Sequence, residues 1–191
     1  MNSTYFFAVR LPPDLCDRLA PGLRALGEIA PSIRPVRADG LHLTVQFLGR
    51  PGPELVAALP AVGASVASRQ PAFNLELGEP GRFGPERNPR VIWLSVRQGA
   101  AELAELNRRL AVALDATALP CDRRRFLPHC TVARVSGELT PAGGSCLTRL
   151  AGELATVARD PVRVTEIQLL QSVPVPGGQN RYVSGGAFAL S

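Results

Sequence analysis

Leu41–Gly49 reads LHLTVQFLG, and one other segment of the chain, Pro128–Arg134 (PHCTVAR), repeats its pattern. Each segment contains a histidine followed two residues later by a threonine, and these two histidines are the only ones in the sequence. Apolar and β-branched residues surround both pairs, which is typical of a buried β-strand. The sequence therefore predicts two related strands, each carrying one histidine.

Side chains two residues apart in a strand point to the same face of the sheet. We therefore expect the first strand to place His42, Thr44 and Gln46 on one face. The other face of this strand is apolar and consists of Leu41, Leu43, Val45 and Phe47. In the second strand His129 and Thr131 share a face in the same way.

The composition describes a globular chain with an excess of positive charge. Of its 191 residues 46% are apolar and the mean hydropathy is +0.08, so we expect a single domain over residues 1–191 with a substantial core. All 21 basic residues are arginine, and the formal net charge is +5. Because arginine forks bind phosphate through paired hydrogen bonds, this charge favours a polyanionic partner.

The cysteines and the hydrophobic segments bear on location. Cys16, Cys121, Cys130 and Cys146 form no CxxC pair and no zinc-ligand spacing, which favours free thiols in a reducing compartment. The N-terminal residues lack the basic and apolar regions of a secretory signal. No apolar run reaches 18 residues, so no membrane span is expected. We predict a cytoplasmic protein that has no contact with a membrane and no evident obligate protein partner.

Alternating and helical patterns account for most of the remaining chain. Strands are predicted at Tyr5–Leu11, Ile33–Val36, Phe73–Leu77, Val91–Val96, Val162–Ser172 and Tyr182–Leu190. Helices are predicted at Pro13–Ile29, Pro53–Ser68, Ala100–Leu114 and Cys146–Val157. Pro21 and Gly22 interrupt the first helix, which is expected to be bent or short. Loops are predicted at Gly78–Pro89, Asp115–Leu127 and Ser136–Ser145, and a turn joins the last two strands.

The order of these elements is weakly repeated in the two halves of the chain. Each half of the chain contains a strand, a helix, a histidine strand and a second helix. This order predicts two similar lobes, each of which contributes one histidine strand to a shared cleft.

Two facing histidines have a natural use in phosphate-ester cleavage. Histidine takes both protonation states near neutral pH, so one imidazole can accept a proton while the other donates one. The threonine hydroxyl beside each ring can donate a hydrogen bond to a phosphate oxygen as negative charge gathers there. This chemistry needs no metal or other cofactor, and the sequence contains no HxH or HExxH motif.

Three alternative interpretations compete with this one. A single histidine in a strand is most often a structural residue, and only the pairing of the motifs argues otherwise. A zinc site at His42, His129 and Cys130 is disfavoured because Cys130 points away from His129 in a strand. A Cys–His nucleophile is disfavoured because Cys130 is predicted to be buried and the other cysteines have no histidine nearby in the sequence.

The paired motifs and their flanks resemble the LigT/ThpR family of RNA 2′,3′-cyclic phosphodiesterases, also called 2′-5′ RNA ligases, in the two-histidine phosphoesterase superfamily. The similarity includes YFFAVRLP at the start, LHLTVQFLG, PRVIWLSV, RFLPHCTVAR and the closing strand pair. The resemblance implies an α+β fold of antiparallel sheets with outer helices and two lobes. It implies hydrolysis of RNA 2′,3′-cyclic phosphate ends to 2′-phosphates, and possible 2′-5′ ligation when a 5′ hydroxyl replaces water.

The resemblance also implies roles for individual residues. His42 resembles the proton donor to the leaving 3′ oxygen, and His129 resembles the base that activates water. Thr44 and Thr131 resemble the residues that bind the phosphate oxygens. Arg134 matches a basic residue of the family, but a regular strand would turn a residue five positions after His129 to the opposite face. The strand is therefore expected to bulge or end near Arg134, unless Arg134 supports the site from behind.

Several other residues are candidates for contacts to RNA. The triplet Arg123, Arg124 and Arg125 could contact the RNA backbone, but a charged loop is more often simply solvated. Tyr5, Phe7 and Phe47 could stack on a base, although core packing is the commoner fate of aromatic residues in strands.

The motifs do not distinguish among related substrates because they contact phosphate. Alternative functions are therefore a related phosphodiesterase acting on 2′-5′ oligoadenylate or cyclic ADP-ribose phosphate, or an RNA-binding module without catalysis. The intact histidines and threonines argue against the last of these.

Overall fold

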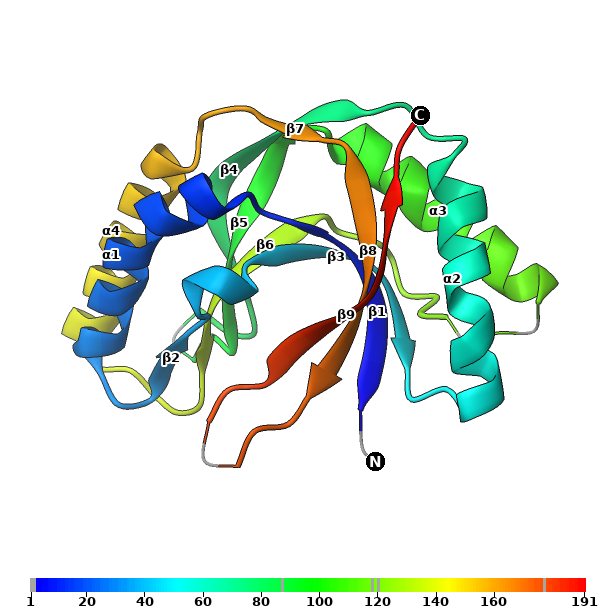
Figure 1. Ribbon diagram of the computed structural model, residues 1–191. Helices are drawn as coiled ribbons and strands as arrows, with labels where there is room; N and C mark the ends of the chain where they lie inside the picture. The colour runs from blue at the N-terminus through cyan, green and yellow to red at the C-terminus, as the bar shows by residue number, and fades with distance from the viewer. Residues whose placement is uncertain (1–2, 87, 118, 120, 177) are drawn as a thin grey trace.

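The computed structural model describes residues 3–86, 88–117, 119, 121–176 and 178–191 (Figure 1). The helices are α1 (Pro13–Ile29), α2 (Pro53–Ala67), α3 (Ala100–Ala116), α4 (Pro141–Val157) and the short 3-10 helix η1 (Ala38–Gly40). The strands are β1 (Thr4–Arg10), β2 (Ile33–Pro35), β3 (His42–Gly49), β4 (Phe73–Phe83), β5 (Val91–Gln98), β6 (His129–Val135), β7 (Val162–Val164), β8 (Glu166–Val173) and β9 (Arg181–Ala189).

The strands form one continuous antiparallel arrangement in the order β7-β4-β5-β6-β3-β1-β8-β9, with β2 paired to β6. Strand β3 lies with β1, β8 and β9 in one lobe, and strand β6 lies with β2, β4, β5 and β7 in the other. The lobes meet where β3 and β6 pair, through the single residue pair Leu43 and Cys130. The predicted α+β fold with two lobes of antiparallel strands is confirmed.

The helices pack in two pairs, one pair on each lobe. Helix α1 packs against α4 beside the β4–β5–β6 lobe, and α2 packs against α3 beside the β1–β3–β8 lobe (Figure 1). Because α1 follows β1 but packs in the opposite lobe, the lobes do not correspond to the two halves of the chain. The main core lies between the α-helices and the strands, so none of the described α-helices covers the opposite face of β3 and β6.

The two histidine strands have the same burial pattern over seven residues. From His42 and from His129, the sequence of exposure is half-buried, buried, half-buried, buried, buried, exposed, buried. Strict alternation breaks at the fourth and fifth positions of each strand. The cause is a β-bulge, since the register shifts between Thr44 and Gln46 in β3 and between Thr131 and Ala133 in β6.

The bulge in β3 contradicts one prediction made from alternation. Gln46 was expected beside His42 and Thr44, but it is 1% exposed and lies on the helix side of the strand. Its amide nitrogen donates to Asp122 O at 3.0 Å, and its amide oxygen accepts from Asn107 Nδ2 at 2.7 Å. Phe47 was expected in the core, but it is 41% exposed and lies opposite Phe6 on the histidine side.

Two segments predicted as loops are largely regular structure. Strand β4 runs on to Phe83 because a register shift between Leu77 and Pro80 accommodates the proline, and Pro80–Phe83 then pairs with β5. Helix α4 begins at Pro141 rather than at Cys146. Thr140 caps it by accepting a hydrogen bond from the Gly143 amide at 3.1 Å, and proline is favoured at the first helical position.

Two further elements differ from their predicted form. Helix α1 is not shortened by Pro21 and Gly22, since it continues to Ile29 and Leu154 of α4 packs closely over Gly22. The predicted strand Val162–Ser172 is divided at Thr165 into β7, which pairs with β4, and β8, which pairs with β1. Residues 87, 118, 120 and 177, within the predicted loops and the last turn, lie outside the described residues.

Candidate active site

The crossing of β3 and β6 brings the two histidine–threonine pairs together. Leu43 and Cys130 are paired and both point into the core. Continuing this antiparallel register places His42 opposite Thr131 and Thr44 opposite His129, all on the face that the described α-helices leave uncovered. Directly opposite residues have Cβ atoms about 5 Å apart, and diagonal neighbours about 7–8 Å apart. The imidazoles therefore occupy one diagonal of a four-residue cluster and the hydroxyls occupy the other. We call this side of the sheet the histidine face.

Each imidazole is held by a hydrogen bond to the carbonyl oxygen two residues before it. The Nδ1 atom of His42 lies 2.7 Å from Gly40 O, and the Nδ1 atom of His129 lies 2.7 Å from Leu127 O. A carbonyl oxygen can only accept, so Nδ1 carries the hydrogen in each ring. In the neutral form this leaves Nε2 as the proton acceptor, which is the atom each ring has available for chemistry.

Aromatic side chains surround both imidazoles. Phe6 stacks on His42 with ring centroids 5.0 Å apart, and Tyr182 meets its edge at 4.8 Å. Phe83 meets His129 edge-on at 5.0 Å, and Trp93 is tilted against it at 5.9 Å. These contacts restrict each ring to one orientation. Sequence reasoning missed all four aromatic residues, because each comes from a strand distant in the sequence from the histidine it contacts.

The environment of His42 favours its neutral form. Burial lowers the pKa of His42 to about 4, and the nearby charges of Arg10, Arg134 and His129 act in the same direction. The hydrogen bond to Gly40 O opposes this change without cancelling it. In the free protein His42 is thus neutral at pH 7, with Nε2 unprotonated.

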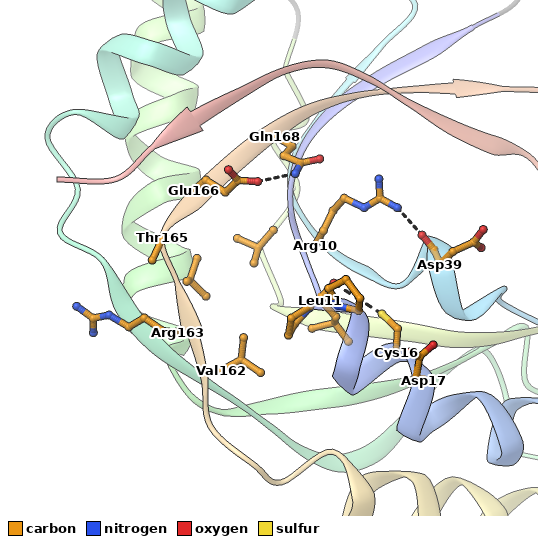
Figure 2. A pocket seen from close by; sticks show the side chains of 14 residues that line it. Arg10, Leu11, Cys16, Asp17, Asp39, Val162, Arg163, Thr165, Glu166 and Gln168 are labelled. Atoms are coloured by element: carbon orange, nitrogen blue, oxygen red, sulfur yellow. Dashed lines mark hydrogen bonds between the residues drawn. The ribbon is translucent and has the colours of Figure 1, made fainter.

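Arg10 is a further residue that sequence reasoning missed. It pairs with His42 across β1 and β3, so its side chain shares the histidine face. Its guanidinium donates to the backbone oxygen of Asp39, in the same short η1 helix whose Gly40 holds His42. Arg10 also borders a cavity of about 490 Å³ (Figure 2). Gln168, the strand partner of Ala8, lines the same cavity close to Arg10 and donates to Glu166 at 2.6 Å (Figure 2).

Arg134 lies on the histidine face. The bulge in β6 moves it to the same side as Thr131, opposite Val91 of β5. The sequence left three possibilities: the strand bulges, it ends near Arg134, or Arg134 supports the site from behind. The structure contains the bulge. Arg134 is exposed, and its charge is near enough to His42 to lower the pKa of that histidine.

The other candidate contacts to RNA differ in their surroundings. Arg123 and Arg124 form ion pairs with Asp115 and Asp122, at 2.7 and 2.6 Å, on the surface. Phe7 is fully buried and Tyr5 packs against the main core, which leaves Phe47 as the exposed aromatic residue of that group.

The cysteines are not placed for nucleophilic chemistry. Cys130 points into the core behind His129, and burial raises the pKa of its thiol to about 12. All four cysteines are free thiols. Within the described ranges, no three histidine, cysteine or acidic side chains come together as a metal site would require. None of the described helices is long and apolar enough to cross a bilayer.

Comparison with known proteins gives a consistent result. A model of the 2′-5′ RNA ligase superfamily matches residues 11–174. A protein of Aeropyrum pernix named RNA 2′,3′-cyclic phosphodiesterase is 32% identical over 158 residues, which cover 82% of this chain and 86% of that protein. A protein of Geobacillus stearothermophilus with the same name is 34% identical over 133 residues, but these cover 70% of this chain and only 42% of that protein.

The fold is also similar to solved structures. The crystal structure of Escherichia coli LigT complexed with 3′-AMP aligns with a TM-score of 0.73 at 28% identity. The alignment covers 99% of this chain and 98% of that one.

Proposed function

The chain belongs to the 2′-5′ RNA ligase superfamily, and we propose that it hydrolyses RNA 2′,3′-cyclic phosphate ends to 2′-phosphates. One observation supports this proposal: β3 and β6 pair at Leu43 and Cys130, and continuing the register from this pair puts the two histidines on one diagonal and the two threonines on the other. A phosphorus atom at the centre would have an imidazole on each side. This is the arrangement that in-line displacement requires, since the attacking and leaving oxygens lie on opposite sides of phosphorus.

The proton transfers follow from the ring orientations. Nε2 of His129 takes a proton from water as the water oxygen bonds to phosphorus. The bond from phosphorus to the 3′ oxygen breaks, and Nε2 of His42 gives a proton to that oxygen. The products are a 2′-phosphate and a free 3′ hydroxyl. If a 5′ hydroxyl attacks phosphorus in place of water, the product is a 2′-5′ bond. This is the ligation after which the superfamily is named.

His42 must take up a proton when the substrate binds. His42 is neutral in the free protein, because burial and two arginines lower its pKa. A bound phosphate brings negative charge beside the ring and offsets the charges of Arg10 and Arg134, which favours the imidazolium form. Binding would thereby prepare His42 as an acid.

Thr44, Thr131 and Arg134 bind the phosphate in this proposal. The threonine hydroxyls donate to the non-bridging oxygens, on which charge accumulates as the new bond forms. Arg134, exposed on the same face, supplies a fixed positive charge to the same group.

The test is the identity of the product. An oligoribonucleotide ending in a 2′,3′-cyclic phosphate should be converted to one with a 2′-phosphate, in buffer containing EDTA. His42→Ala and His129→Ala should each abolish turnover while leaving the circular dichroism spectrum unchanged. Binding without conversion would favour a non-catalytic RNA-binding module, and loss of activity in EDTA would indicate a required metal ion.

The partner is an RNA or oligonucleotide end, recognised through its phosphate. The cytoplasmic location remains a prediction, and the four free thiols agree with a reducing compartment.

A further inference from the structure

Two arginines face each other at the outer end of strand β6. Arg34 of β2 is the direct partner of Arg134 in the antiparallel β2–β6 pair. Directly opposite residues in such a pair have their side chains on the same face, so Arg34 shares the histidine face with Arg134. Both side chains are exposed. The flanking residues Ile33 and Val135 are buried on the other side.

Among the described residues, no carboxylate lies within ion-pair distance of either guanidinium group. Ten other arginines form ion pairs with carboxylates, but within the described part of the chain neither Arg34 nor Arg134 does. Like charges directly opposite one another destabilise a strand pair. An anion between the two guanidinium groups would reverse the sign of that contribution, because each fork can donate two hydrogen bonds to phosphate.

The two arginines lie on the sheet at increasing distance from the candidate active site. Arg134 follows Thr131 by three residues, which is about 10 Å at most along a strand. Arg34 lies one strand farther out than Arg134. Opposite this edge, the connection between β8 and β9 reaches over from the other lobe, and Gln179 Nε2 donates to Pro35 O at 2.5 Å. Arg34 therefore lies at the outer edge of the histidine face, one strand farther than Arg134 from the candidate active site.

We propose that Arg34, together with Arg134, binds the phosphate on the 5′ side of the reacting nucleotide. This inference rests on the proposed function and extends it. Arg134 contacts both phosphates, whereas Arg34 contacts only the second one. The enzyme would consequently prefer a cyclic end that carries a 5′ phosphate or a longer chain over a nucleoside 2′,3′-cyclic phosphate.

Arg34→Gln tests this with three matched substrates. These are adenosine 2′,3′-cyclic phosphate, the same compound with a 5′ phosphate, and a short oligoribonucleotide with the same cyclic end. The variant should lose roughly 10-fold in kcat/KM on the second and third substrates, as expected for one charge-assisted hydrogen bond. It should match the wild type on the first. The salt dependence of oligonucleotide binding should decrease by about 0.7 in slope, the value for one lost phosphate contact on a single strand.

Two control variants sharpen the result. Arg24→Gln removes an exposed arginine on helix α1 that forms no ion pair with any described carboxylate, and it should leave all three rates unchanged. Arg34→Lys keeps the charge and should recover part of the loss. Unchanged turnover of the first substrate shows that each variant is folded.

The outcomes separate this inference from the proposed function. Equal losses on all three substrates would place Arg34 at the reacting phosphate, and no loss on any would remove it from binding; either result overturns the inference. If the wild type converts none of them, the proposed function fails. The affinity of wild type and Arg34→Gln for an oligonucleotide ending in a 2′-phosphate then decides the inference alone, and equal affinities would contradict it.

Discussion

Phe47 and Arg134 occupy equivalent positions on the two histidine strands. Each lies five residues after its histidine, and a β-bulge at the same point of each strand moves it onto the histidine face. The two lobes thus present different chemistry in related places. One lobe offers an exposed aromatic ring and the other an exposed cation.

The position of Arg134 predicts a role in binding the reacting phosphate. Arg134→Gln removes a charge-assisted hydrogen bond worth about 1.5–3 kcal/mol, so kcat/KM on adenosine 2′,3′-cyclic phosphate should fall roughly 10- to 100-fold. Arg24→Gln serves as the matched control. A rate within twofold of the wild type would mean that Arg134 does not touch the reacting phosphate.

His42 should make the stability of the protein depend on pH. The folded state keeps His42 neutral down to its pKa of about 4, whereas the unfolded chain takes up a proton near the ordinary value of 6.5. Between these values the unfolded state binds more protons, so stability is lost as the pH falls from 7 towards 4. The loss due to His42 is at most about 3 kcal/mol.

Urea unfolding of the wild type and of His42→Gln at pH 7 and pH 4 measures this contribution. Carboxylates titrate in both proteins and cancel in the comparison. The free energy of unfolding should fall further in the wild type than in the variant. The same decrease in both proteins would show that His42 is not buried as a neutral ring.

Arg10 should lower the proton affinity of His42 through its charge. Burial is the main cause of the low pKa of His42, and Arg10 adds to it from the neighbouring strand. In Arg10→Gln the pKa of His42 should therefore rise, although it should stay below 6.5. NMR titration can follow this directly, because the chain has only two histidines. An unchanged midpoint would show that Arg10 is screened from the ring by solvent.

The sequence was sufficient to locate the two pairs of catalytic candidates, and the reason is local. The spacing of His42 and Thr44, and of His129 and Thr131, places each pair on one face of a strand without any knowledge of tertiary structure. The two bulges could not be predicted in the same way. A bulge is a mismatch between two paired strands, and Val45 and Val132 look like ordinary strand residues in the sequence.

The residues that surround the site could not be predicted from the sequence, for a related reason. Phe6, Tyr182, Phe83 and Trp93 become partners of the histidines only through strand order and register. Arg10 is likewise brought to His42 by pairing between β1 and β3. Glycine and proline were also misleading near Pro80 and Gly143, because an adjacent strand and a threonine cap supply the backbone partners that a loop would lack.

Gly81 offers a test of how the aromatic surroundings position His129. It is the cross-strand partner of Trp93, and a Cβ atom at this position would overlap the indole ring. Gly81→Ala should displace Trp93, which tilts against His129, and a misplacement of about 1 Å at a catalytic group can lower kcat about 100-fold. Trp93 is the only tryptophan, so its fluorescence reports the displacement directly.

In Gly152→Ala the new methyl group meets no atom within 4 Å, and both kcat and fluorescence should match the wild type. The double variant Gly81→Ala/Trp93→Phe gives the methyl group room and should regain part of the activity. If Gly81→Ala shifts the fluorescence but leaves kcat unchanged, the orientation of His129 is set by its hydrogen bond to Leu127 alone.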